Sequence, residues 1–273
     1  MKSRVVLYCL LGGFPLAIIT LAAGHFVWWW LSGILFAASL VPVALFGPRK
    51  AAGQFGVILP VFLIVTALCT WSEALIFVPG YSQHAIRDLS GSAFMYLIIT
   101  MVLALLAWLL KLSKPGGPAL TRRSPISAVF LILLSGFAYV VYYLIFGSIT
   151  YQFFTKGYYP GATQLVERLG VWLFWSIELA RGVLMTLAVV PIIYTLRMKR
   201  WHAAIAVGSI IWICGGPGLL IVPNEFMRTA QRIIHTVEIF TQNFPLGVTA
   251  VLLLRPKPLP HATNSPSAST VPV

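Results

Sequence analysis

Residues 26–46 read FVWWWLSGILFAASLVPVALF and contain no charged residue. An α-helix rises 1.5 Å per residue, so a helix of about 20 apolar residues spans the ~30 Å hydrocarbon core of a bilayer. The basic residues Arg49 and Lys50 follow directly, and Trp28, Trp29 and Trp30 lie near the opposite end, where aromatic side chains meet lipid headgroups. This stretch therefore predicts a transmembrane helix.

The whole chain has the same apolar character. Only 9% of its 273 residues are charged, 59% are hydrophobic and the mean hydropathy is +0.90, whereas a soluble domain has about a quarter of its residues charged. The net charge of +13 would suggest a nucleic-acid partner in a soluble protein. Here the basic residues form short clusters between apolar stretches, so we expect the lipid bilayer as partner and no nucleic acid.

Eight stretches are long and apolar enough to cross a membrane, which predicts an all-α, polytopic transmembrane bundle. The first follows Met1–Arg4 and is longer than the 7–15-residue core of a signal peptide, so we interpret it as a span, with cleavage near Gly24 as the alternative. The predicted spans are residues 5–23, 26–46, 53–78, 92–112, 126–154, 171–196, 203–222 and 233–254.

The lysines and arginines predict the orientation of the bundle, because cytoplasmic segments carry the excess of these residues. Thirteen of the 19 lie at the termini and in alternate loops, and six lie on the other side. We therefore expect both termini in the cytoplasm and a plasma-membrane (bacterial inner-membrane) location. The six outer residues are Arg87, Lys156, Arg168, Arg181, Arg228 and Arg232.

The chain is predicted to be one bundle, residues 1–254, divided into four plus four spans by an inner loop at 113–124. Residues 255–273 are rich in proline and small polar residues, which is typical of a disordered tail. The basic inner face is also expected to attract anionic lipid.

All six acidic residues lie in outer loops or in the outer halves of spans. An ionisable group inside a membrane costs a few kcal/mol, so it is normally paired or faces a polar cavity. Three places in the outer half therefore matter. The acidic residues are Glu73, Asp88, Glu167, Glu178, Glu225 and Glu238.

The first place is the sixth span, where Glu178 and Arg181 are three residues apart and can pair on one face of the helix. The pair either locks helix packing or has a function. The second place is Glu73, near the outer end of the third span, beneath a loop at 80–88 that holds His84, Arg87 and Asp88.

The third place is the last span. Arg228, Arg232, His235, Glu238 and Gln242 follow one another at steps of 4, 3, 3 and 4, which places them in one stripe along a helix. The alternative is a partly solvated helix end with snorkelling arginines. We predict that the three places converge on one outward-facing polar pocket.

Such a pocket predicts a transporter or binder of a small anionic or lipid-like solute, whose anionic group Arg181, Arg228 and Arg232 would attract. One alternative is a membrane-embedded enzyme acting on a lipid or lipid-linked phosphate, with His235 or Glu238 as acid/base; another is a non-catalytic subunit or assembly protein. No HExxH or Walker A motif occurs, so no catalytic residue is assigned. The cysteines Cys9, Cys69 and Cys214 have no metal-binding spacing, and we expect buried thiols, no metal and no cofactor.

Overall fold

The computed structural model describes residues 1–77, 81–114, 123–157, 170–224 and 227–256, and these form helices without a β-strand. Eight helical segments are long and apolar enough to cross a membrane, which confirms the predicted all-α, eight-span fold. Five spans are single helices: α1 (Lys2–Ile19), α2 (Phe26–Phe46), α5 (Ala85–Leu109), α9 (Val171–Thr195) and α12 (Thr229–Leu254).

The other three spans are composite, with π-helical segments (η2, η4 and η5) or a break inside them. The short helices η1 (Leu21–Ala23) and η3 (Tyr81–Gln83) lie between spans. The composite spans are α3 (Ala51–Pro60) with η2 (Val61–Cys69) and α4 (Thr70–Phe77); α6 (Pro125–Tyr142) with η4 (Tyr143–Gly147), α7 (Ser148–Thr150) and η5 (Tyr151–Thr155); and α10 (Arg200–Gly215) with α11 (Pro217–Leu220).

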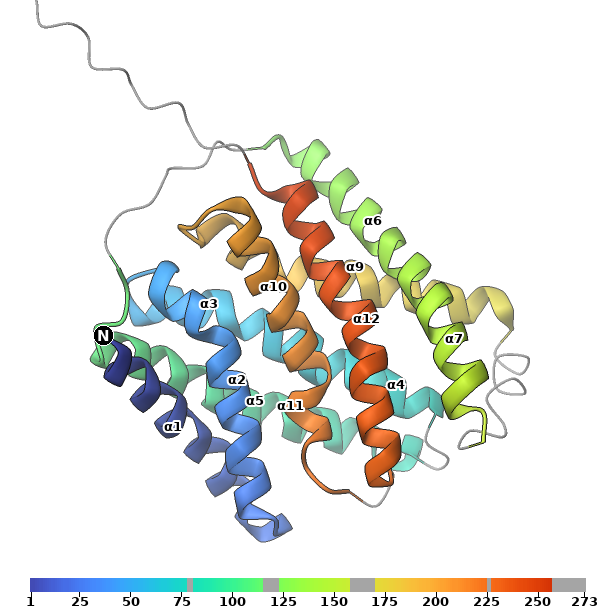
Figure 1. Ribbon diagram of the computed structural model, residues 1–273, viewed down its shortest axis with the longest axis horizontal. Helices are drawn as coiled ribbons and strands as arrows, with labels where there is room; N and C mark the ends of the chain where they lie inside the picture. The colour runs from blue at the N-terminus through green and yellow to red at the C-terminus, as the bar shows by residue number, and fades with distance from the viewer. Residues whose placement is uncertain (78–80, 115–122, 158–169, 225–226, 257–273) are drawn as a thin grey trace, which may run out of the picture.

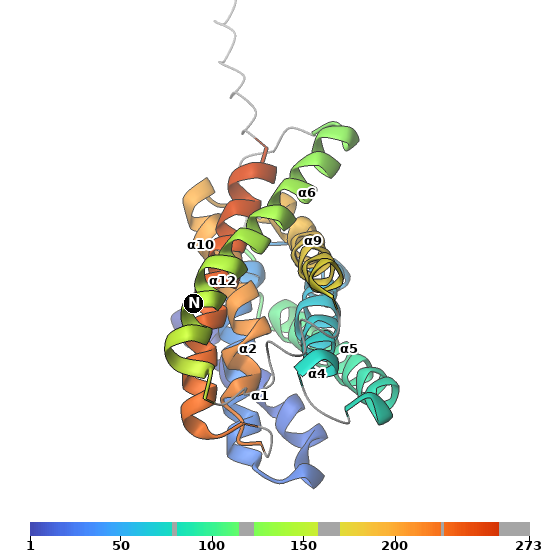
Figure 2. The same cartoon turned by 90° about the vertical axis from the view of Figure 1, so that its right-hand side faces the viewer.

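The spans form a flattened ring of two layers (Figures 1 and 2). Helices α2, α10 and α12 pack in that order in one layer, and α5, the α3–η2–α4 span and α9 pack in the other. Helix α1 closes one edge by packing on α2 and α5, and α6 closes the opposite edge by packing on α9 and α12. Contacts of η2 with α10 and of α9 with α12 join the layers across the middle.

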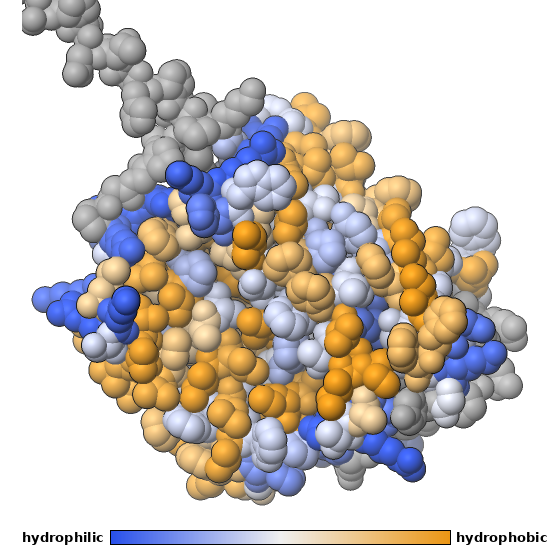
Figure 3. Space-filling model, viewed as in Figure 1, coloured by the Kyte–Doolittle hydropathy of each residue, from blue (hydrophilic) through white to orange (hydrophobic). Residues whose placement is uncertain are grey.

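The outer surface of the ring suits a lipid environment. Figure 3 shows hydrophilic residues gathered at opposite ends of the visible face, with a broad apolar band between them. Large apolar side chains such as Phe94, Trp108, Phe130 and Phe153 are more than half exposed. In water these would be costly, whereas against lipid tails they are expected.

The two span starts that differ most from the prediction lie earlier than expected, because a span can begin with a polar turn. Helix α5 begins at Ala85, whereas residue 92 was predicted, so Arg87 and Asp88 lie in its first turns and their assignment to a loop was wrong. Asp88 is favourable there because the helix N-terminus carries partial positive charge. Helix α12 begins at Thr229, four residues before predicted residue 233.

Several arginines at the basic end of the bundle bind carbonyl groups at the C-terminal ends of helices. Arg255 donates to the carbonyls of Ile193, Leu196 and Met198 at 2.7–3.0 Å. Arg197 binds the carbonyls of Phe46 and Gly47. Arg123 binds Leu253 and Leu254, and Arg200 binds Leu252. Since helix C-termini carry unsatisfied carbonyls and partial negative charge, these contacts tie the spans together.

The orientation of the bundle remains a prediction, and reporter fusions test it. Reporters fused after Lys50, Arg123 and Arg200 should be active in the cytoplasm, and reporters fused after Gly80 and Gly161 should be active outside. The reason is the unequal distribution of lysine and arginine between the two ends. One reporter on the opposite side would contradict the proposed orientation.

Candidate functional site

A buried arginine lies between carboxylates from two different spans. Nη1 of Arg181 donates to both carboxylate oxygens of Glu178, at 3.0 and 2.8 Å, and Nη2 donates to Glu73 Oε1. Glu178 is fully buried, Arg181 is 6% exposed, and the Glu73 side chain is 25% exposed. This triad carries two acids against one base, so its formal charge is −1.

The triad depends on how two spans are built. Glu178 and Arg181 lie one turn apart on α9, as predicted from their spacing. Glu73 comes from α4, directly after the π-helical segment η2, and η2 packs against α9. A π-helical segment changes the angular position of the residues that follow it, and such segments recur at functional sites.

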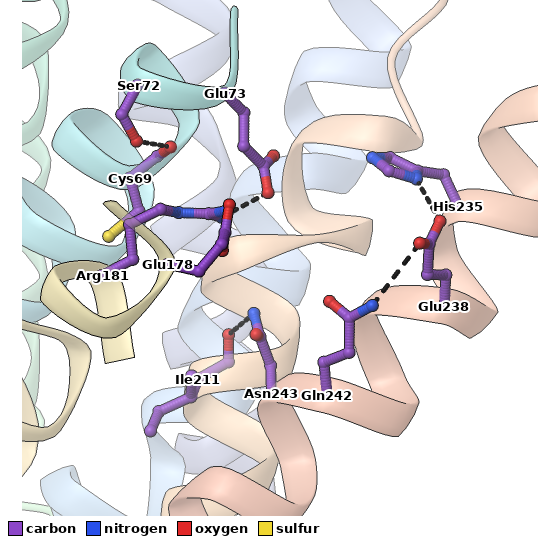
Figure 4. A network of polar contacts seen from close by, with 10 residues as sticks. All are labelled: Cys69, Ser72, Glu73, Glu178, Arg181, Ile211, His235, Glu238, Gln242 and Asn243. Atoms are coloured by element: carbon purple, nitrogen blue, oxygen red, sulfur yellow. Dashed lines mark hydrogen bonds and ion pairs between the residues drawn. The ribbon is translucent and has the colours of Figure 1, made fainter. Parts of the chain in front are cut away.

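Three of the five residues of the stripe predicted on the last span, His235, Glu238 and Gln242, interact along α12. His235 Nδ1 lies 2.8 Å from Glu238 Oε2, and Gln242 Nε2 lies 3.4 Å from Glu238 Oε1. The His235 and Glu238 side chains are 23% and 14% exposed. Figure 4 shows the triad on one side and the His235–Glu238 pair on the other, with Gln242 and Asn243 between them.

A small cavity lies among these residues. Its volume is about 270 Å³ with the open solvent at its mouth included, and its enclosed part has room for about one water molecule. Typical ligand pockets enclose roughly 300–1,000 Å³, so the cavity must widen before it can hold a solute larger than water. It is lined by Val65, Cys69, Thr70, Glu73, Tyr139, Arg181, Met185, Gly215, Ile239, Gln242 and Asn243.

The cavity offers both hydrogen-bond donors and acceptors. Nε of Arg181 is buried and has no hydrogen-bond partner among the described residues. Gln242 and Asn243 are 4% and 5% exposed; their amide nitrogens donate to Glu238 and to the carbonyl of Ile211, and their amide oxygens are hydrogen-bond acceptors. A buried donor without a partner is uncommon in native proteins, and a water molecule or a polar solute in the cavity would satisfy it.

A helix break adds backbone polarity beside the cavity. Helix α10 ends at Gly215, the backbone turns at Gly216 (φ −142°, ψ −100°), and α11 starts at Pro217. Proline has no N–H, so the carbonyl of Ile213 loses its normal helical partner. Asn243 Nδ2 reaches another carbonyl of the same helix end, that of Ile211, at 3.5 Å.

The sequence-predicted residues divide into those that meet at the cavity and those that do not. Glu73, Arg181 and Gln242 line it; Glu178 is joined through Arg181, and His235 and Glu238 through Gln242. Two predicted residues lie elsewhere: Arg228 is the exposed N-cap of α12, and Arg232 donates to the carbonyls of Leu220 and Ile221 and to Thr229.

Sequence reasoning missed Cys69 and Tyr139 as cavity residues. Cys69 is buried, as predicted for a structural thiol, but it also lines the cavity. Its spacing of four residues from Glu73 could have indicated a shared helix face. The ring of Tyr139 lies 6.0 Å from the guanidinium carbon of Arg181, and no sequence signal pointed to that contact.

Glu167, Arg168 and Glu225 lie outside the described residues. Within the described part of the chain, no group of three or more His, Cys, Asp or Glu residues is placed to hold a metal ion. Comparisons with protein-family models, with curated proteins and with solved structures found no match. The function must therefore be inferred from the chemistry of the residues themselves.

Proposed function

We propose that the protein is a membrane transporter for a small solute with a net positive charge, which binds in the cavity between η2–α4, α9 and α12. The observation that supports this is the buried triad of Glu73, Arg181 and Glu178 at the wall of that cavity. Intramembrane ionisable groups are expensive and typically mark solute or ion pathways.

The charge balance favours a cation over the anionic solute expected from the sequence. Arg181 was expected to attract an anion, yet both of its terminal nitrogens already donate to carboxylates. The residual charge of the triad is negative, and a buried net charge costs several kcal/mol unless it is offset. A solute carrying one positive charge and an oxygen acceptor for Nε of Arg181 would satisfy both requirements.

The discontinuous seventh span is the second support for transport. Transporter sites near the middle of the membrane are commonly built where a helix is interrupted, because the freed carbonyls bind cations. Here the break at Gly216 follows the cavity residue Gly215. The small enclosed volume fits a conformation that must widen to admit or release the solute.

No described feature favours the two alternatives over transport. A phosphate-processing enzyme needs an arginine free to hold phosphate oxygens in its site. Arg181 and Arg232 are bonded within the protein, and Arg228 is exposed at the N-terminus of α12 and does not line the cavity. A purely structural subunit does not need a polar cavity. Anionic lipid remains a proposed partner of the exposed basic side chains at the other end, which are Lys2, Arg4, Arg49, Lys50, Lys111 and Lys199.

The thiol of Cys69 provides a test, because it lies in the cavity wall. In a variant with Cys9→Ala and Cys214→Ala, membrane-impermeant thiol reagents should modify Cys69 from both sides, in right-side-out and in inside-out vesicles. A transporter exposes its site alternately to the two sides. The cationic reagent 2-(trimethylammonium)ethyl methanethiosulfonate should react at least about tenfold faster than the anionic 2-sulfonatoethyl methanethiosulfonate.

Two controls make the result interpretable. A cysteine-free variant with Cys69→Ala should not react, and Ser82→Cys, introduced into that background on the exposed helix η3, should react from one side only. Modification of Cys69 from one side only, or from neither, would contradict transport. Equal rates for the two reagents would contradict the cation preference.

A further inference from the structure

We infer that the His235–Glu238 pair on α12 holds a proton that competes with the cationic solute, so that the protein exchanges protons for that solute. This inference rests on the proposed function and adds the coupling ion. It concerns residues that do not themselves line the cavity.

The geometry of the pair suits reversible protonation. Nδ1 of His235 and Oε2 of Glu238 are 2.8 Å apart, within hydrogen-bond distance in a largely dry environment. Histidine is the side chain whose charge changes between about pH 5 and pH 8. When His235 is protonated beside the Glu238 carboxylate, the two side chains form an ion pair. The formal charge of the pair then rises from −1 to 0, and neither side chain has to move.

The stripe on α12 provides a path from the outer end of the helix to the pair. His235 lies six residues after the first residue of α12, Thr229, which is about 9 Å along the helix axis. Glu238 and Gln242 continue inward on the same face, and Gln242 lines the cavity. A charge on His235 is therefore separated from the solute by only one glutamate and one glutamine.

The proton and the cationic solute compete because the same charged groups interact with the His235–Glu238 pair and line the cavity. Glu73 on α4 and Arg181 on α9 interact electrostatically with His235, and Glu178 on α9 and Tyr143 on η4 interact with Glu238. On α12 itself, Arg232 is bonded to carbonyl groups. The only titratable side chain on α11 or the outer part of α10 is Cys214, whose Sγ lies 4.0 Å from Ser39 Oγ.

With His235 neutral, Glu73, Glu178 and Glu238 against Arg181 leave two formal negative charges, and with His235 protonated they leave one. The first state attracts a cation more strongly than the second. Because linkage is reciprocal, a bound cationic solute must also favour loss of the proton. The carboxylates of the triad are less suited to the exchange, since Arg181 binds both of them.

The test compares the two charged thiol reagents at Cys69 across a pH range. Between about pH 8 and about pH 5.5, which brackets the ordinary pKa of histidine, the rate of the cationic reagent divided by that of the anionic reagent should fall at least about fivefold. The ratio cancels the loss of thiolate on acidification, because both reagents attack the same thiol. His235→Gln keeps a polar side chain without the charge, and it should leave the ratio nearly constant.

His84→Gln is the matched control, since His84 is exposed at the N-cap of α5, and it should respond to pH like the parent. Glu238→Gln is a second variant, useful if His235→Gln fails to fold. It should also flatten the response over this pH range, because a largely buried imidazole that has lost its carboxylate partner resists protonation. A ratio that does not change with pH, or that changes equally in His235→Gln and the parent, overturns the proton site. The ratio of rates can be measured with reagents added from one side of the membrane. A failure of the proton site can therefore be distinguished from a failure of transport, which labelling from one side only would show.

Discussion

Replacing Arg181 by Gln is expected to lower the free energy of unfolding by about 3–5 kcal/mol, the usual cost of breaking a buried ion pair. Glu178 is fully buried and its carboxylate accepts two hydrogen bonds from Arg181. Glutamine cannot supply the charge or reach both carboxylates, so Glu73 and Glu178 would remain close together without a counter-charge. The loss of stability should appear as a lower midpoint of equilibrium unfolding, measured in mixed detergent micelles.

A second substitution that restores the net charge of the triad shows how much of the lost stability comes from the unbalanced charge and how much from lost packing. Combining Arg181→Gln with Glu178→Gln removes the fully buried carboxylate that would otherwise be unpaired, so the double variant should recover a large part of the stability. Arg87→Gln is the matched control. Arg87 pairs with Asp88 at 3.4 Å, but its side chain is 77% exposed, and exposed pairs contribute less than about 1 kcal/mol.

The two outcomes also bear on the role of the triad. If Arg181→Gln is no less stable than Arg87→Gln, the buried triad is not an ion pair of the kind described. If the double variant folds like the parent yet Cys69 loses its preference for the cationic reagent, Arg181 and Glu178 serve the solute site in addition to the fold.

The sequence alone predicted the eight spans, because hydrocarbon thickness and backbone hydrogen bonding leave a chain of this composition few alternatives. It also predicted the pairing of Glu178 with Arg181, which lie three residues apart on one helix. His235 and Glu238 were predicted only to share a stripe, although their equal spacing of three residues brings them together in the same way.

Contacts between spans could not be predicted in the same way. The ion pair of Glu73 with Arg181 joins residues 108 positions apart, and it depends on which helices are neighbours in the ring. The π-helical segment η2 also changes the direction in which Glu73 points, and no hydrophobic pattern reports that change. For the same reason, Arg232 was expected to attract an anion, whereas it binds the carbonyls of Leu220 and Ile221.

The close crossing of α10 and α12 leads to the second large expected effect. A Cβ atom at Gly247 would lie 2.6 Å from Cα and 2.7 Å from N of Gly208. These are backbone atoms, so Gly247→Ala must push the two helices apart. Small residues such as glycine are what allow helices in a membrane to approach so closely. We expect Gly247→Ala to cost about 1–3 kcal/mol of unfolding free energy, the range found for overpacked cores.

The same displacement should reach the cavity, because α10 carries Gly215 and α12 carries Gln242 and Asn243. Gly247→Ala should therefore change the rate at which Cys69 reacts with the cationic reagent, in addition to lowering stability. Gly91→Ala is the matched control on α5, since a Cβ atom there meets nothing within 4 Å. It should not lower stability, because alanine favours a helix over glycine, and it should not change the labelling rate of Cys69. If Gly247→Ala and Gly91→Ala unfold at the same midpoint, α10 and α12 are not in backbone contact. The cavity between η2, α9 and α12 would then lack the rigid wall on which the proposed site depends.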